Sequence, residues 1–261
     1  MYARNYPYCS TRFAAMAHRG GALWEPNLGK ENTRYAFSQA VSLGYRYLET
    51  DLQATKDGRL VCFHDTTLDR MTGVSGRVCD VTAEELAGIS IAGEPIPFFD
   101  EIVTAFPEVR FNVDLKTSDA VLPLVRAIDA YDLFDRILVD SFSQARISHF
   151  RGLTKGRVPT AMAPIGVAWT ALIPILSGVI SSPGVALQVP ISEKVGPVFV
   201  HVVTQETIER VHRLGKVIHV WTINDPQEME CLIDWGVDGI ITDRPDLLKE
   251  ILVRRNLWEY E

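Results

Sequence analysis

Short apolar runs alternate with amphipathic stretches along the whole chain, and this alternation limits the possible folds more than any other feature. Eight runs have the length and composition of buried strands, and they span residues 13–17, 45–52, 110–116, 136–142, 158–163, 184–190, 216–223 and 238–243. Most segments between them have helical spacing, and several end in a glycine typical of a helix C-terminus, such as Gly44, Gly215 and Gly236. Thr204 and Asp225 are predicted N-caps. Strands separated by helices favour a parallel sheet.

The length of the chain allows these units to close into one barrel. The chain has 261 residues, and (β/α)8 barrels form single domains of ~250 residues. A doubly wound sheet would instead need a phosphate loop such as GxGxxG after its first strand, and the segment HRGGALW at 18–24 does not match one. We therefore predict an α/β fold, a (β/α)8 TIM barrel, in a single domain over residues 1–261.

The segment after the second predicted strand breaks the alternation. Residues 55–76 read TKDGRLVCFHDTTLDRMTGVSG, and their Asp-Gly pair, flanked by extended residues, predicts a hairpin. We place this insertion at about residues 54–98, in the second strand-to-helix connection. Such connections lie on the face where barrel enzymes have their active sites.

Charge and cysteine usage narrow the class of protein. The net charge is −7 and the sequence has no basic stripe, so we expect no nucleic-acid partner. The four cysteines have no close spacing such as CxxC, which argues against a zinc site and favours reduced thiols in the cytoplasm. The N-terminal residues lack the apolar core of a signal peptide.

Residues 158–192 contain no charged side chain. Five prolines divide this segment into pieces shorter than the ~20 apolar residues of a membrane span, so we predict a strand, a buried helix over 166–178 and a strand. An alternative is an apolar lip beside the active site that contacts a lipid tail or a membrane surface. The sequence does not decide the oligomeric state.

Polar side chains gather at the ends of the first three predicted barrel strands and in the insertion. They are His18, Arg19, Glu49, Asp51, His64, Asp114 and Lys116. Side chains two residues apart on a strand point the same way, so Glu49 and Asp51 share one face. If these faces point into the barrel, three carboxylates converge there.

Converging carboxylates in a partly buried site must take up protons or bind a cation. Their oxygen atoms suit Mg²⁺ or Ca²⁺, and such a cation together with Arg19 and Lys116 would hold a phosphate group. His18 and His64 could then divide the proton transfers, one activating the nucleophile and the other protonating the leaving alkoxide. This combination of residues predicts cleavage of a phosphodiester.

Several motifs resemble, in order, those of the glycerophosphodiester phosphodiesterases. They are AHRG (17–20), ENT (31–33), ETD (49–51), TKDGRLVCFHDTTLDRMT (55–72), DLK (114–116), VWTIN (220–224) and ITDRP (241–245). The resemblance runs from about residue 13 to about residue 249. It implies a TIM barrel with the hairpin insertion, one divalent cation, and hydrolysis of a small glycerophosphodiester to glycerol 3-phosphate and an alcohol.

The resemblance also assigns roles to residues. It implies that His18 and His64 are the acid–base pair and that Arg19 contacts the phosphate. Lys116 is expected near the phosphate or near a metal carboxylate, and the implied metal ligands are Glu49, Asp51 and Asp114. The third ligand in the family is commonly a glutamate in an E-x-K pattern, so Asp114 is a departure, which also resembles sphingomyelinase D-type barrels. Glu31 is placed at the edge of the site, with a helix-capping role as the alternative.

Two further residues are weaker candidates for substrate contact. Trp221 is expected either to form an apolar wall for the substrate or to belong to the barrel core, and Gln188 is expected to point inward and bond to substrate. The other candidate functions are a lysophospholipase D-type activity, a silent barrel that binds a phosphorylated ligand, and a sugar-phosphate isomerase or aldolase. The last of these would place its phosphate site after strands seven and eight.

Overall fold

Eight parallel segments form a closed barrel. The structure is a computed structural model that describes residues 1–168, 182–195 and 198–259. Its barrel strands are β1 (Ala14–His18), β2 (Tyr47–Ala54), β6 (Arg110–Leu115), β7 (Ile137–Asp140), β8 (Ala186–Val189), β11 (Val217–Val220) and β12 (Gly239–Thr242). They pair in the order β7–β6–β2–β1–β12–β11–β8. Residues 160–161 close the ring, because Thr160 bridges Val139 of β7 and Ala161 bridges Ala186 of β8. The predicted (β/α)8 barrel is confirmed.

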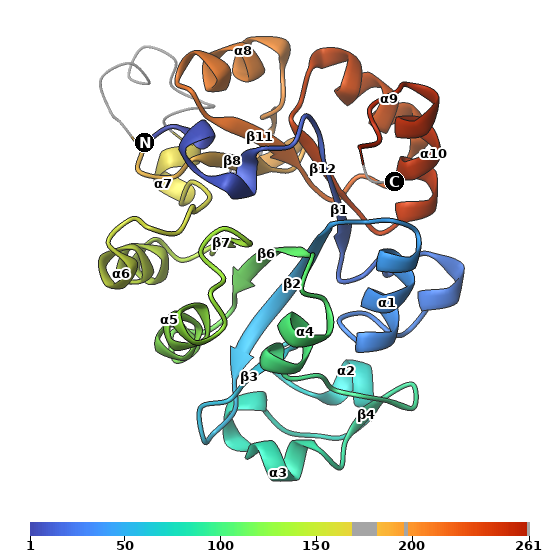
Figure 1. The fold of residues 1–261 in the computed structure, drawn as a ribbon, viewed down its shortest axis with the longest axis vertical. Coiled ribbons are helices and arrows are strands. Elements are labelled where there is room, and N and C mark those ends of the chain that lie inside the picture. The colour runs from blue at the N-terminus through green and yellow to red at the C-terminus, as the bar shows by residue number, and fades with distance from the viewer. Residues whose placement is uncertain (169–181, 196–197, 260–261) are drawn as a thin grey trace.

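Helices lie around the strands and cover the outer face of the barrel (Figure 1). They are α1 (Arg34–Ser42), α4 (Phe99–Ala105), α5 (Val121–Ala130), α6 (Gln144–Thr154), α7 (Pro164–Val167), α8 (Gln205–Arg213), α9 (Pro226–Trp235) and α10 (Pro245–Arg254). Thr204 and Asp225 cap α8 and α9 as predicted, each accepting a hydrogen bond from a backbone N–H of the first turn.

Side-chain alternation along each strand separates two cores. Outward-facing side chains such as Leu48 and Phe111 join the large core beneath the helices, whereas Met16, Tyr47 and Leu138 fill the inside of the barrel. The alternation that directs Tyr47 inward also directs the next odd-numbered residues of β2 inward. The carboxylates of that strand therefore stand above an apolar plug.

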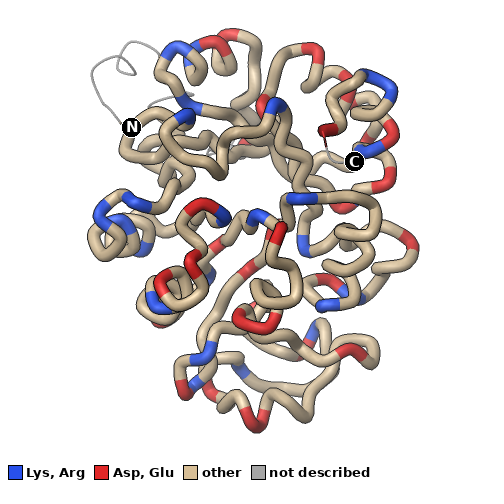
Figure 2. The backbone as a smooth tube through the Cα atoms, in the orientation of Figure 1, with Lys and Arg blue, Asp and Glu red and all other residues tan. Residues whose placement is uncertain are grey.

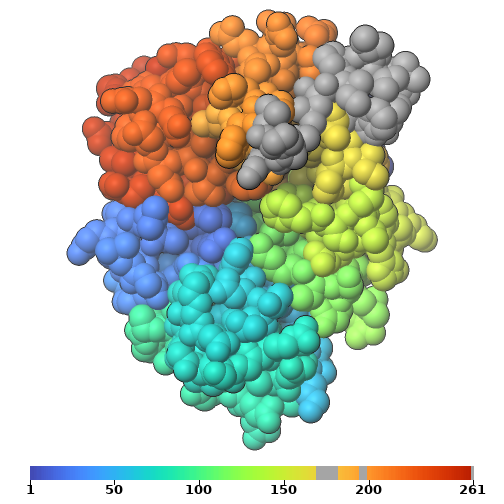
Figure 3. All heavy atoms as spheres, turned by 180° about the vertical axis from the view of Figure 1, so that it is seen from behind, coloured from blue at the N-terminus to red at the C-terminus, as the bar shows by residue number. Residues whose placement is uncertain are grey.

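The predicted hairpin insertion is present. Strand β3 (Leu60–Cys62) pairs antiparallel with the end of β2, and the Asp-Gly turn joins the two. The insertion continues through α2 (Asp69–Thr72), α3 (Ala83–Leu86), β4 (Ser90–Ile91) and β5 (Glu94–Pro95). A separate apolar cluster that includes Val61, Phe63 and Leu86 stabilises it. In Figure 3 the insertion (teal) forms the lower part of the visible face.

The charge-free segment has the two predicted strands, at 160–161 and at β8. The helix predicted over 166–178 falls mostly outside the described residues, which include only α7 at its start. In the described part of the chain, no helix is long and apolar enough to cross a membrane. An antiparallel pair of strands, β9 (Ser192–Val195) and β10 (Val198–His201), follows β8 and was not predicted. Figure 2 shows Lys and Arg interspersed with Asp and Glu along the chain.

Candidate active site

A polar cavity of 160 Å³ lies at the C-terminal ends of the barrel strands. Nine residues predicted from the sequence line it: His18, Arg19, Glu49, Asp51, His64, Asp114, Lys116, Gln188 and Trp221. They come from β1, β2, β6, β8 and β11 and from the insertion, so the closed barrel and its hairpin together assemble the site. The location matches the rule that barrel enzymes act at this face.

The turn after β1 places Arg19 inside the site. Arg19 and Gly20 both have positive φ, 52° and 87°, a region that is costly for residues with a side chain. A Cβ on Gly20 would lie 2.8 Å from the carbonyl carbon of Ala36, so only glycine lets the turn pack against α1. The Arg19 guanidinium consequently reaches Glu31 and Asp51.

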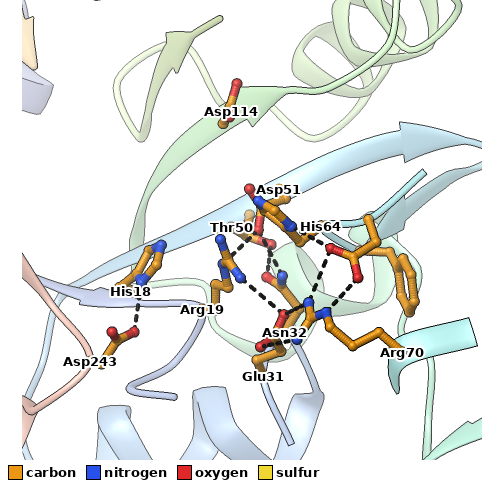
Figure 4. A network of polar contacts seen from close by, with 12 residues as sticks. His18, Arg19, Glu31, Asn32, Thr50, Asp51, His64, Arg70, Asp114 and Asp243 are labelled. Carbon is orange, nitrogen blue, oxygen red and sulfur yellow. Dashed lines mark hydrogen bonds and ion pairs between the residues drawn. The ribbon is translucent and has the colours of Figure 1, made fainter. Parts of the chain in front are cut away.

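His18 is held by carboxylates on both sides of its ring. Its Nδ1 lies 2.6 Å from Oδ1 of Asp243 (Figure 4). Its Nε2 lies 3.8 Å from Oε2 of Glu49. Because an ionised carboxylate can only accept, Asp243 fixes the proton on Nδ1. Burial alone would lower the pKa of His18, but the Glu49 and Asp243 charges outweigh it and raise that pKa.

We expect Asp243→Asn to lower kcat by at least about 10²-fold, because the amide no longer fixes the His18 tautomer. Steady-state kinetics with a pH profile measures the effect, and Asp243→Glu should restore part of the rate. The His212–Asp238 pair is a matched control, since its 2.8 Å contact lies outside the cavity. Asp238→Asn should therefore keep the wild-type kcat. If Asp243→Asn keeps it as well, Asp243 does not position His18.

His64 repeats this arrangement on the insertion. Its Nδ1 lies 2.6 Å from Oδ1 of Asp65. Hydrogen bonds from Arg70 are the main reason that the pKa of Asp65 falls to about 2, which keeps this carboxylate ionised. In both histidines, Nδ1 is therefore hydrogen-bonded to an aspartate, and Nε2 is left for other contacts.

The three predicted metal ligands are buried, and two of them, Asp51 and Asp114, pair with Lys116. Asp51 lies 2.8 Å from Nζ of Lys116 and 3.1 Å from Nε of Arg19, and these charges hold its pKa low against the effect of burial. Asp114 Oδ2 lies 2.6 Å from the same Nζ. Burial, followed by the charge of Asp51, raises the pKa of Glu49 to about 7.

The donor chemistry of these carboxylates fits a divalent cation. Glu49, Asp51 and Asp114 offer only oxygen atoms, the ligands that Mg²⁺ and Ca²⁺ prefer. Oδ1 of Asp114 is buried without a hydrogen-bond partner, which leaves a lone pair for a ligand. Among the residues that the structure describes, no three His, Cys, Asp or Glu side chains converge closely enough to enclose an ion. Asp51 and Asp114 are instead paired with Lys116.

Some polar residues of the site were not predicted. Asp140 is the direct neighbour of Asp114 in the strand register and lines the same cavity. Burial and then the charge of Asp114 raise its pKa to about 7. The alternation that turns Leu138 inward on β7 also turns Asp140 inward and could have identified it. Asn32, which donates to Asp51 over 2.9 Å, lies within the ENT motif but was given no role.

Glu31 belongs to the polar network and does not cap the helix. Its carboxylate accepts hydrogen bonds from Arg19 and Arg70 (Figure 4). The N-cap of α1 is Thr33, whose side chain accepts from the backbone N–H of Ala36. The predicted position at the edge of the site is therefore correct, and the alternative capping role is wrong.

Gln188 points into the barrel, and its amide nitrogen already has two partners. Nε2 lies 2.9 Å from Oδ1 of Asn112 and 3.0 Å from Nδ1 of His219. Trp221 packs on the inner core and also borders the cavity, where its ring meets Phe142 edge-on with centroids 5.8 Å apart. Trp221 therefore both packs on the barrel core and forms part of the cavity wall, the two alternatives that the sequence allowed.

Stability should fall in acid because of His219. Burial lowers its pKa to about 4, whereas an unfolded histidine titrates near 6.5, so protons favour the unfolded chain between these values. Because of this residue, the free energy of unfolding should fall by about 2 kcal/mol when the pH is lowered from 8 to 5. Denaturant unfolding of wild type and His219→Gln measures the difference. Identical pH dependence in both proteins would contradict the prediction.

Comparisons with known proteins agree with this geometry. The model of the "Glycerophosphoryl diester phosphodiesterase family" matches residues 18–247. The chain is 35% identical over 251 residues to the probable glycerophosphodiester phosphodiesterase 2 of Mycobacterium tuberculosis, covering 94% of this chain and 92% of the relative. It is 33% identical over 251 residues to a glycerophosphodiester phosphodiesterase of Caldanaerobacter subterraneus, covering 89% and 95%.

A solved structure has the same fold. It is a phosphodiesterase of Oleispira antarctica in complex with the product sn-glycerol-3-phosphate. The two structures superpose with a TM-score of 0.78 at 20% identity, over 95% of this chain and 99% of the other.

Proposed function

Because the chain belongs to the glycerophosphoryl diester phosphodiesterase family, we propose that this phosphodiesterase uses a His/His pair and a divalent cation to release glycerol 3-phosphate and an alcohol. One observation carries the proposal. Two histidines, each held through Nδ1 by an aspartate, line one cavity with Arg19 and Lys116. This arrangement supports a role for the two histidines as proton carriers and for Arg19 and Lys116 as the cations that bind the phosphate of one small substrate.

The residues divide the reaction as follows. Arg19 and Lys116 hold the phosphate oxygens, since both are fixed cations at the cavity wall. One histidine accepts a proton from the attacking water, and the other donates a proton to the oxygen of the departing alcohol. The bond between phosphorus and that oxygen breaks as the bond between phosphorus and the water oxygen forms. Glu49, Asp51 and Asp114 would hold Mg²⁺ or Ca²⁺, which neutralises charge on the phosphate.

The test is release of glycerol 3-phosphate from glycerophosphocholine and glycerophosphoethanolamine, with Mg²⁺, with Ca²⁺ and with EDTA. We expect turnover with at least one cation and its loss with EDTA, followed by recovery when the cation is added in excess. Turnover that persists in EDTA after exhaustive dialysis would contradict the role of the cation. A cation-loaded, folded enzyme that cleaves neither substrate would contradict the proposed products.

A further inference from the structure

A second cavity of 310 Å³ opens beside the polar one. The two cavities share Asp140, Phe142, Gln188 and Trp221, so a ligand can extend from one into the other. The second cavity lies on the side of β7 and β8, whereas His64 borders the polar cavity from the insertion after β2. A phosphodiester held at the polar site therefore has one arm that faces this second cavity.

The walls of the second cavity are mainly aliphatic. Met162, Val167, Val189 and Val202 contribute to them, together with two prolines and an alanine. Most of these residues belong to the charge-free segment 158–192, which explains why the walls carry so few polar groups. Among the described residues that line the cavity, the charged ones are Asp140 and Glu193. Phe142 and Trp221 stand where the two cavities meet.

We propose that this cavity binds an aliphatic chain carried by the substrate, so that the enzyme prefers an amphiphilic phosphodiester to one with two small polar groups. This inference rests on the proposed function of the adjoining polar site. An aliphatic wall gains from burying methylene groups, whereas glycerol hydroxyls would find few partners there. The volume is at the lower end of the range for small-molecule sites, so it suits a short length of chain.

A quaternary ammonium group is the alternative occupant. Phe142 and Trp221 could contact such a cation, and Glu193 could balance its charge. We favour the aliphatic chain because, among the described lining residues, aliphatic side chains and prolines outnumber the two aromatic rings, which stand where the two cavities meet. The experiment below separates the two occupants.

The experiment compares kcat/KM for four soluble substrates with the cation-loaded enzyme. Glycerophosphocholine and glycerophosphoethanolamine have no chain, hexanoyl lysophosphatidylcholine carries a chain on glycerol, and glycerophosphohexanol carries one on the alcohol. A buried methylene contributes about 0.8 kcal/mol, or about fourfold, so we expect one of the last two to exceed glycerophosphocholine by at least about 10-fold. Whichever is improved identifies the arm that enters the cavity.

Two positions on α7 provide a matched pair of variants. Val167 lines the cavity, whereas Ile165 is exposed on the same helix and does not line it. Val167→Asp should remove most of the chain preference and leave the kcat/KM for glycerophosphocholine unchanged, and Ile165→Asp should change neither. Thermal unfolding confirms that both variants fold. Inhibition of the wild-type enzyme by alkyl phosphates of increasing length adds a measurement that needs no variant, with an expected gain of about fourfold per methylene.

Three results would overturn the inference. They are equal kcat/KM with and without a chain, a chain preference that Val167→Asp leaves intact, and inhibition that does not strengthen with chain length. A preference for glycerophosphocholine over glycerophosphoethanolamine with no gain from a chain would assign the cavity to the ammonium group. In each case, cation-dependent cleavage of glycerophosphocholine would show that the proposed function itself still holds.

Discussion

Replacing His18 or His64 with Gln should lower kcat for glycerophosphodiester hydrolysis by about 10²–10⁴-fold, the range that one proton-transferring side chain contributes. Glutamine can still hydrogen-bond to Asp243 or Asp65, so the carboxylates keep a partner. It cannot accept and release a proton near neutral pH, so the chemical step is lost while the fold remains. Steady-state kinetics, with thermal unfolding as a check on folding, measures both effects.

His149 is the matched control for this pair. It is exposed on α6, and it does not line the polar cavity. His149→Gln should keep the wild-type kcat. The His18→Gln/His64→Gln double variant should be little worse than either single variant, because residues that act as a unit are not additive. A folded single variant that keeps more than about a tenth of the wild-type kcat would remove that histidine from the acid–base pair.

The sequence could predict the barrel and its polar end because both depend on short-range patterns. Alternation along β2 directs Glu49 and Asp51 inward together, and the register of β2 with β6 sets Asp51 directly opposite Asp114. The Asp-Gly turn predicted the hairpin that brings His64 to the site. Each of these inferences needed only neighbouring residues and the rule that parallel strands end at one face.

The features of the site that the sequence did not predict depend on contacts between segments far apart in the chain, which no local pattern encodes. Asp243 meets His18 only because the barrel closes and sets β12 beside β1. Lys116 was predicted near the phosphate or near a metal carboxylate, and the sequence could not decide between the two. Its amine lies at two of the predicted metal carboxylates, Asp51 and Asp114. The charge-free segment had allowed an apolar surface beside the active site as one alternative. Its position beside Trp221 follows from the packing of α7 and β8.

Asp51→Asn is expected to damage both stability and activity, because Asp51 is the centre of the charge network. Its carboxylate pairs with Arg19 and Lys116 and accepts from Asn32, and the residue is only 1% exposed. Removing one partner of a buried ion pair costs about 3–5 kcal/mol. We expect a loss of that size in unfolding free energy, and a fall in kcat/KM of at least about 10³-fold as the phosphate and cation ligands lose their positions.

Denaturant unfolding with and without Mg²⁺ or Ca²⁺ separates the two roles of Asp51. A bound cation stabilises the folded chain according to its concentration relative to its dissociation constant, so wild type should gain stability from the cation and Asp51→Asn should not. Asp100 is the matched control, since its pair with Arg59 is exposed on the surface, and Asp100→Asn should cost less than about 1 kcal/mol. An Asp51→Asn protein that loses stability yet gains as much from the cation as wild type would make Asp51 a structural residue, and the ion would then have to be held by other carboxylates.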